Sequence, residues 1–398
     1  MYSWKHALSC LALLALIAAL TGCGGVSASG AITPTPSPTP SPTGTPSLTP
    51  SPSPTPTPPT HSNFVFGVID FEADGFFAGK INSSTGQITR VNKNPIANPL
   101  GQNIVVQLLS DPKGRFLYAL DIGASSFGIQ FGQIGISAFR INKSSGMLAP
   151  APGQIFFPVQ RFGQLAMDGS GRFLYQPDGS AIDVYTINQS TGQLTAMAAN
   201  TPAPPVGGFS AATSDGKFLI NEGNGQVMVY TIDPGNGQLM SATTPMSTGG
   251  SGGPIAVSAD NAFLYAANSM QGTVAAFSIA TNGALTLMAG SPFPTDVAAT
   301  GMALSPNGKF LFITLQNGAD NHVAGFAVNP AAGTFTVIPG ATVAGATSVN
   351  VDSSGKFAYI SLGKLATYKI DPLTGALMPL WQTAQPFTDI PTNIVLSP

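Results

Sequence analysis

The sequence predicts an all-β fold, a seven-bladed β-propeller of four-stranded blades. The first observation is a repeated motif in which a glycine turn is followed by Lys or Arg, then Phe and an apolar strand. From Phe173 onward the Phe returns every ~45 residues, which is the period of a four-stranded propeller blade. The clearest copies of the motif are residues 111–116, 168–173, 214–218, 305–310 and 353–357, and a weaker copy is 258–263.

A second repeated motif, a glycine turn that leads into the outer strand of a blade, gives the number of blades. Seven copies occur, at residues 84–88, 145–148, 190–194, 236–239, 282–285, 332–335 and 373–377. The first motif occurs only six times, because the domain begins at Phe64 with a second strand and no inner strand before it. Residues 393–398 are similar to the inner strands of other blades. We therefore expect the C-terminal strand to pair with residues 64–70 and close the ring without an open edge.

Composition supports this class and argues against one kind of partner. The chain has 46 Gly, and only 8% of its residues are charged, with a formal net charge of −2. Abundant Gly with Phe, Val, Ile and Thr between short polar turns is typical of β-structure. Nucleic-acid binding needs clustered Lys and Arg, so we expect no nucleic-acid partner.

The N-terminus has the pattern of an export signal. Lys5 and His6 precede an apolar run over residues 7–20, which is short for a membrane span and typical of a signal peptide. The run ends in Leu-Thr-Gly before Cys23, which resembles the bacterial lipoprotein signal, whose cysteine is lipidated. We expect residues 1–22 to be a lipoprotein signal peptide and Cys23 to anchor an exported protein to a membrane of the bacterial cell envelope. The alternative is an ordinary signal peptide with an incidental cysteine.

A linker follows, over residues 23–62, and the propeller domain is expected at 63–398. Residues 33–60 are almost entirely Pro, Ser and Thr, which favours an extended polyproline II segment. At about 3.1 Å per residue this segment would reach roughly 90 Å. Because Cys10 would be removed with the signal, Cys23 would be the only cysteine left, and no intrachain disulfide could form.

The propeller topology separates the charged residues onto two faces. Turns between first and second strands share one face with the third-to-fourth turns, and loops between second and third strands surround the channel mouth on the other. The first face is expected to carry Lys113, Arg115, Arg172, Lys217, Lys309 and Lys356, and the mouth Glu72, Asp74, Asp121, Asp178, Glu222 and Asp320. An acidic mouth could attract a cation or a basic partner; alternatively, these are solvated loop charges without a ligand.

The second blade has an unusually long segment between its second and third strands. Residues 121–135 are apolar and rich in Gly, and they include Phe127 and Phe131. One interpretation is a loop that covers the channel mouth or forms a partner surface, with Asp121, Phe127 and Phe131 as binding residues. The other is a longer hairpin of the second and third strands.

Residues for known catalytic or metal chemistry are scarce. The propeller has one histidine, His322, which we expect in a polar surface loop over 318–322. The Gly-rich run 249–253 lacks the strand-helix context of a functional glycine motif, and no His-based zinc spacing occurs, so we expect no metal and no cofactor.

Two strand ends carry a resemblance to a known family. Residues 172–179 (RFLYQPDG) and 217–222 (KFLINE) are similar to strands of the lactonase family of seven-bladed propellers, which includes bacterial 6-phosphogluconolactonases and is related to surface-protein propeller repeats. The resemblance covers 63–398. It implies that Glu222 is a catalytic residue, with Asn221 and Asp178 in the same site.

The rest of the family's site departs from this pattern. Gly163 stands where the family has a histidine, and residues 207–209 (GGF) stand where it has Pro-Arg-His. Lactone chemistry needs a proton donor or acceptor beside the ring and a cation for the carboxylate. Glu222 could be the first, and Arg161 could substitute for the second.

Three functions follow from these patterns. The first is a lipid-anchored binding module with a depleted catalytic site, which takes a small ligand or a protein at the channel mouth. The second is a lactone hydrolase that acts outside the cytoplasm through Glu222. The third is a purely structural envelope protein. Fold alone does not decide between them, because propellers host many functions.

Overall fold

The computed structural model divides the chain into two units by contacts, residues 1–56 and 57–398. It describes residues 63–69, 75–91, 96–97, 103–124, 131–152, 156–158, 163–177, 181–197, 208–295, 297–318, 320–329, 334–382 and 391–398. The predicted signal peptide, Cys23 and the linker lie outside the described residues. Every described strand belongs to the compact unit 57–398, so this unit contains a complete core of its own.

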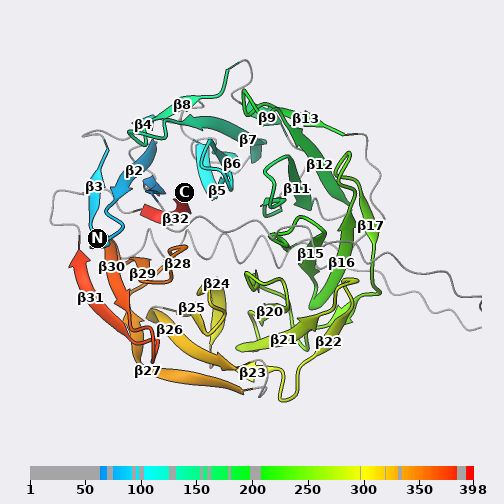
Figure 1. The fold of residues 1–398 in the computed structure, drawn as a ribbon, viewed down its shortest axis with the longest axis vertical. Coiled ribbons are helices and arrows are strands. Elements are labelled where there is room, and N and C mark those ends of the chain that lie inside the picture. Colours follow the sequence, from blue (N-terminus) through cyan, green and yellow to red (C-terminus); the bar gives the residue numbers. More distant parts are fainter. Residues whose placement is uncertain are drawn as a thin grey trace, which may run out of the picture. The chain divides into compact units, whose positions relative to one another are not determined.

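Seven antiparallel sheets form a ring, and each contains a path of four strands that runs outward from the centre (Figure 1). The predicted seven-bladed propeller is confirmed. Blade 1 contains β32 (Pro391–Ser397), β1 (Phe64–Ile69), β2 (Gly75–Ile81) and β3 (Ile88–Arg90). Blade 2 contains β5 (Asn103–Ser110), β6 (Phe116–Ala124), β7 (Phe131–Ile141) and β8 (Leu148–Pro150). Blade 3 contains β10 (Ala166–Met167), β11 (Phe173–Pro177), β12 (Ile182–Ile187) and β13 (Leu194–Ala196).

The remaining blades follow the same order along the chain. Blade 4 contains β14 (Phe209–Ala212), β15 (Phe218–Gly223), β16 (Gln226–Ile232) and β17 (Leu239–Ser241). Blade 5 contains β19 (Ile255–Val257), β20 (Phe263–Asn268), β21 (Thr273–Ile279) and β22 (Leu285–Leu287). Blade 6 contains β24 (Ala298–Leu304), β25 (Phe310–Asn317), β26 (Asp320–Asn329) and β27 (Thr334–Ala344). Blade 7 contains β28 (Ser348–Val351), β29 (Phe357–Ser361), β30 (Leu365–Ile370) and β31 (Leu377–Gln382).

Short additional strands pair with the third strands of four blades. They are β4 (Ile96–Ala97), β9 (Phe156–Pro158), β18 (Met246–Ser247) and β23 (Phe293–Pro294). Within the described ranges the chain forms no helix of the length and hydrophobicity that a membrane crossing requires.

The C-terminal strand closes the ring as predicted. β32 pairs antiparallel with β1, with Phe66 opposite Val395, and the amide of Asn63 donates to the carbonyl oxygen of Ser397 at 2.8 Å. In Figure 1 the red β32 lies beside the blue strands of blade 1. Both ends of the domain are therefore held in one sheet.

The residue that opens each first-to-second turn explains part of the first repeated motif. It is a buried Asp, Ser or Thr whose side chain accepts backbone amides at the start of the second strand. Asp168 accepts the amide of Phe173 at 2.7 Å, and Thr213 accepts the amide of Phe218 at 3.0 Å. Ser258, Ser305 and Asp352 do the same in blades 5, 6 and 7. Each such bond satisfies a backbone donor that has no strand partner.

The two repeated motifs meet at the blade interfaces, which explains why both recur. Gly192, at φ +82°, packs against Phe116 of the preceding blade so closely that a Cβ on Gly192 would lie 2.5 Å from the Phe116 ring. The same contact joins Gly86 with Phe357, Gly146 with Phe64, Gly237 with Phe173, Gly283 with Phe218 and Gly375 with Phe310. The glycine is needed twice, for its positive φ and for the close approach.

The long segment of blade 2 is a hairpin. β6 and β7 stay paired out to Ala124 opposite Phe131, which is the second of the two interpretations. The tip of this hairpin, including Phe127, lies outside the described residues. For Phe131 the structure describes the strand but not the side chain.

Candidate functional site

Glu222 lies near the end of β15, where the second strand of blade 4 reaches the mouth face. Its side chain is 1% exposed and points toward blade 5, where Oε2 accepts the backbone amide of Gly253 at 3.0 Å. Gly252 covers the carboxyl so closely that a Cβ there would lie 2.5 Å from Oε1. The glycine run 249–253 therefore allows the backbone of blade 5 to close over the acid.

Burial decides the ionisation of Glu222. It raises the pKa of this carboxyl from 4.5 to about 8, although hydrogen bonds from the Gly253 and Gly225 amides act in the opposite direction. The carboxyl is therefore mostly protonated at neutral pH. Oε1 has no hydrogen-bond partner among the described residues. A neutral, enclosed acid of this kind can donate a proton only if the backbone above it opens.

Asn221 does not join Glu222, because successive side chains of a strand point to opposite faces of the sheet. Its amide donates to Ser210 Oγ at 3.0 Å and to the carbonyl oxygen of Phe209 at 3.3 Å. Leu219, on the same face of β15 as Asn221, belongs to the apolar cluster shared with blade 3. Asn221 therefore faces the interface with blade 3, and Glu222 faces the interface with blade 5.

The expectation that Asp121 and Glu222 lie in loops around the mouth is wrong, and so is the alternative that they are solvated charges. Asp121 is 0% exposed within β6, and Ser137 of β7 donates to its carboxylate. Both acids lie in strands that continue further than the sequence suggested. Asp320 is exposed at the start of β26, as expected. Glu72, Asp74, Arg161 and Asp178 lie outside the described residues, so the proposed pairing of Arg161 with Glu222 stays a prediction.

The mouth end of the second strands also holds buried polar residues that the sequence analysis missed. Asn268 in blade 5 donates to the carbonyl oxygen of Thr248 at 2.8 Å and accepts from its hydroxyl at 2.6 Å. Gln176, Thr314 and Ser361 occupy similar positions in blades 3, 6 and 7 and are also buried. All lie three to five residues after the anchoring Phe, which is the sequence signal that would have found them.

His322 is not in a surface loop. It lies in β26 opposite Leu315 and is half-buried, so that expectation is wrong. Within the part of the chain that the structure describes, no group of three or more His, Cys, Asp and Glu side chains is placed to hold a metal ion.

Gly163 and Gly208, which stand where the family has larger residues, pack directly against backbone atoms. A Cβ on Gly163 would lie 1.7 Å from the carbonyl oxygen of Pro177. A Cβ on Gly208, at φ +98°, would lie 2.3 Å from the carbonyl oxygen of Glu222. The backbone at the openings of blades 3 and 4 leaves no room for a side chain at either position.

Comparison with known families identifies the fold. The model of the family described as lactonase, seven-bladed β-propeller, matches residues 164–348 and 209–394, which together span more than half of the chain. The chain belongs to the lactonase family. A comparison with curated proteins finds no significant sequence match.

Several solved structures have a similar fold. A Bacteroides fragilis protein assigned as a 6-phosphogluconolactonase has a TM-score of 0.64 at 20% identity, over 87% of this chain and 100% of its own. A Bacteroides uniformis protein with the same assignment has a TM-score of 0.64 at 18% identity, over 85% and 99%. The periplasmic gluconolactonase of Pseudomonas aeruginosa has a TM-score of 0.63 at 17% identity, over 85% and 99%. At these identities the likeness concerns the fold alone.

Proposed function

We propose that this lactonase-family chain is a lipid-anchored propeller of the bacterial cell envelope that binds a ligand or protein at its mouth face, with a depleted catalytic site. The anchor is the lipidated Cys23, and the linker 23–62 holds the ring away from the membrane. The main support for a depleted catalytic site is the packing of Gly163 and Gly208. Where the family has a histidine and an arginine, the backbone fills the space that their side chains need.

The arrangement around Glu222 supports the same proposal. Its carboxyl is enclosed by Gly252 and Gly253, and Asn221 faces the opposite side of the sheet. A lactone would need its ring oxygen within hydrogen-bond reach of the acid, about 2.6–3.2 Å. The closed backbone keeps a substrate beyond that distance.

Lactone turnover is the direct test. Residues 57–398 are incubated with gluconolactone and with 6-phosphogluconolactone, next to the Glu222→Gln variant. We expect hydrolysis by the protein to match that by the variant and the uncatalysed rate. Turnover that disappears in Glu222→Gln would overturn the binding proposal in favour of catalysis. Lipidation is tested separately, by incorporation of a labelled fatty acid that Cys23→Ser abolishes.

The second candidate, a lactone hydrolase outside the cytoplasm, is favoured by one property of Glu222. A carboxyl whose pKa is raised to about 8 is protonated at neutral pH and suits a general acid. Water would attack the lactone carbonyl carbon, and Glu222 would protonate the ring oxygen as the acyl C–O bond breaks. The proton lost by the water would return to the Glu222 carboxylate, and Arg161 would hold the substrate's negative charge. A periplasmic gluconolactonase has this fold, which is consistent with such an activity. The candidate requires a pH–rate profile with an inflection near the pKa of Glu222.

A further inference from the structure

A small cavity that is wide open to solvent lies between blades 2 and 3, on the face that carries the first-to-second and third-to-fourth turns. Its volume is about 210 Å³, and it is lined by Arg115, Phe116, Arg140, Ile141, Lys143, Gln189 and Ser190. Three of these seven residues carry a positive charge. Glu222 is in blade 4, at the opposite ends of the strands, so the cavity is separate from the candidate site described above.

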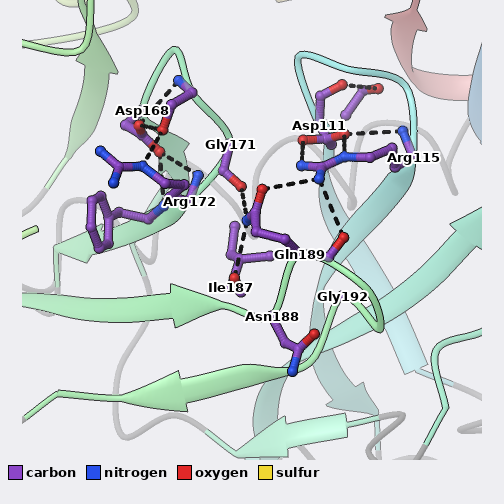
Figure 2. A network of polar contacts seen from close by, with 12 residues as sticks. Asp111, Arg115, Asp168, Gly171, Arg172, Ile187, Asn188, Gln189 and Gly192 are labelled. Atoms are coloured by element: carbon purple, nitrogen blue, oxygen red, sulfur yellow. Dashed lines mark hydrogen bonds and ion pairs between the residues drawn. The ribbon is translucent and has the colours of Figure 1, made fainter. Parts of the chain in front are cut away.

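Arg115 forms a fixed wall of this cavity. Its Nε and Nη2 donate to the two carboxylate oxygens of Asp111, each at 2.8 Å, and Nη1 donates to Gln189 Oε1 at 2.9 Å (Figure 2). The guanidinium carbon lies 5.3 Å from the centre of the Phe116 ring. Gln189 is itself held, because its amide donates to the carbonyl oxygens of Gly171 and Ile187 at 2.8 and 3.0 Å. All three nitrogens of Arg115 therefore already donate within the protein, and Arg115 contributes a rigid, positively charged wall.

Arg140 and Lys143 supply the uncompensated charge. Arg140 donates from Nη2 to the carbonyl oxygen of Ser190 in blade 3, which holds its side chain across the junction. Its Nε and Nη1, and the ammonium of Lys143, have no hydrogen-bond partner among the described residues. Asp111 compensates Arg115, so three cations and one carboxylate leave a net charge of +2 around the cavity.

The third cation, Lys143, distinguishes this junction from the others. Arg140 stands opposite Phe116 in the pairing of the second and third strands of blade 2, and lysines hold the corresponding position in blades 1 and 7, Lys80 and Lys369. In blades 3 to 6 that position is uncharged, with Thr186, Thr231, Ser278 and Ala327. Lys143 lies three residues after Arg140, and no other blade has a charged residue at that place.

We propose that this cavity binds a phosphate monoester. A dianionic phosphate matches the net charge of +2, and its oxygens suit the fork of a guanidinium and the point charge of an ammonium. The buried Phe116 and Ile141 form the floor of the cavity beneath the charged groups. The volume fits a phosphate with a few carbon atoms rather than a drug-sized ligand.

The test uses residues 57–398 and glycerol 3-phosphate as the probe, titrated by calorimetry at low salt. We expect saturable binding that Arg140→Gln/Lys143→Gln weakens by about tenfold or more, because two charge-assisted contacts are lost. The matched control is Lys309→Gln/Lys356→Gln, which removes two exposed cations from the same face in blades 6 and 7 and should change the affinity less than about twofold.

Two outcomes would overturn the proposal. One is the absence of binding, and the other is an equal loss of affinity in both double variants, which would indicate only the general charge of the face. Vesicles of phosphatidylcholine with and without phosphatidic acid then distinguish the source of the phosphate. Binding that requires both phosphatidic acid and Arg140/Lys143 indicates a lipid headgroup, and binding of glycerol 3-phosphate alone indicates a soluble ester.

Discussion

Replacing Gly192 by Ala tests whether the contact between the two repeated motifs holds neighbouring blades together. The new Cβ would lie 2.5 Å from Cδ1 of Phe116, and at φ +82° it would also strain the backbone. Left-handed backbone costs about 1–2 kcal/mol for a non-glycine residue. Overpacking adds about 1–3 kcal/mol, since Phe116 is 2% exposed and lies beneath Arg115. The expected loss of unfolding free energy is therefore about 3 kcal/mol.

Gly308→Ala is the matched control for this substitution. Gly308 has φ +69°, but no atom lies within 4 Å of the position of its Cβ. Only the backbone term remains, so the expected loss is about 1 kcal/mol. The measurement is the free energy of unfolding of residues 57–398 in urea for each variant. Equal losses in the two variants would show that the contact between Gly192 and Phe116 does not hold the blades together. The same conclusion would follow if adding Phe116→Leu to Gly192→Ala restored none of the lost stability.

Three further predictions concern burial, closure and hydrogen bonding. Because the folded pKa of Glu222 is raised, its contribution to stability is complete below the unfolded pKa of about 4.5 and is lost as the pH rises through about 8. The fall of the melting temperature between about pH 5 and about pH 8 should therefore be smaller in Glu222→Gln than in the wild type, and unchanged in the exposed control Asp320→Asn. Deleting residues 394–398 removes most of the β1–β32 pairing and the buried Ile394 and should lower the unfolding free energy by about 5 kcal/mol; an unchanged melting temperature would contradict the closure. Tyr118→Phe loses a 2.9 Å hydrogen bond to a carbonyl oxygen of blade 3, whereas the hydroxyl of Tyr230 donates, among the described residues, only to the thioether sulfur of Met228. Denaturant unfolding should therefore show a loss of about 1 kcal/mol for Tyr118→Phe and less for Tyr230→Phe.

The ring could be predicted because its determinants are local and repeated. Phe116 and Gly192 are 76 residues apart in number, yet each belongs to a motif whose spacing alone reveals the blade. The closure was predictable for the same reason, since an unpaired inner strand at the C-terminus matched a missing one at the N-terminus. What the motifs did not reveal is that they contact each other, because that contact crosses between blades.

The candidate site was less predictable, because charge in a sequence does not reveal where a strand ends. Asp121 and Glu222 read as loop acids at a channel mouth, but β6 and β15 continue past them and bury both. Gly163 could be recognised as a departure from the lactonase pattern. That Pro177 occupies the space of the missing side chain depends on the approach of two backbones, which no single-sequence pattern contains.

The 2.8 Å hydrogen bond between Asn63 and Ser397 makes the domain suitable for circular permutation. Since the domain's first and last residues touch, a few added residues would link them covalently and turn the noncovalent joint into a continuous loop. The molecule could then be opened elsewhere, for instance at Leu373, which is 90% exposed in a turn of blade 7. Such a circular permutant should keep all seven sheets, with the joint moved to a different blade.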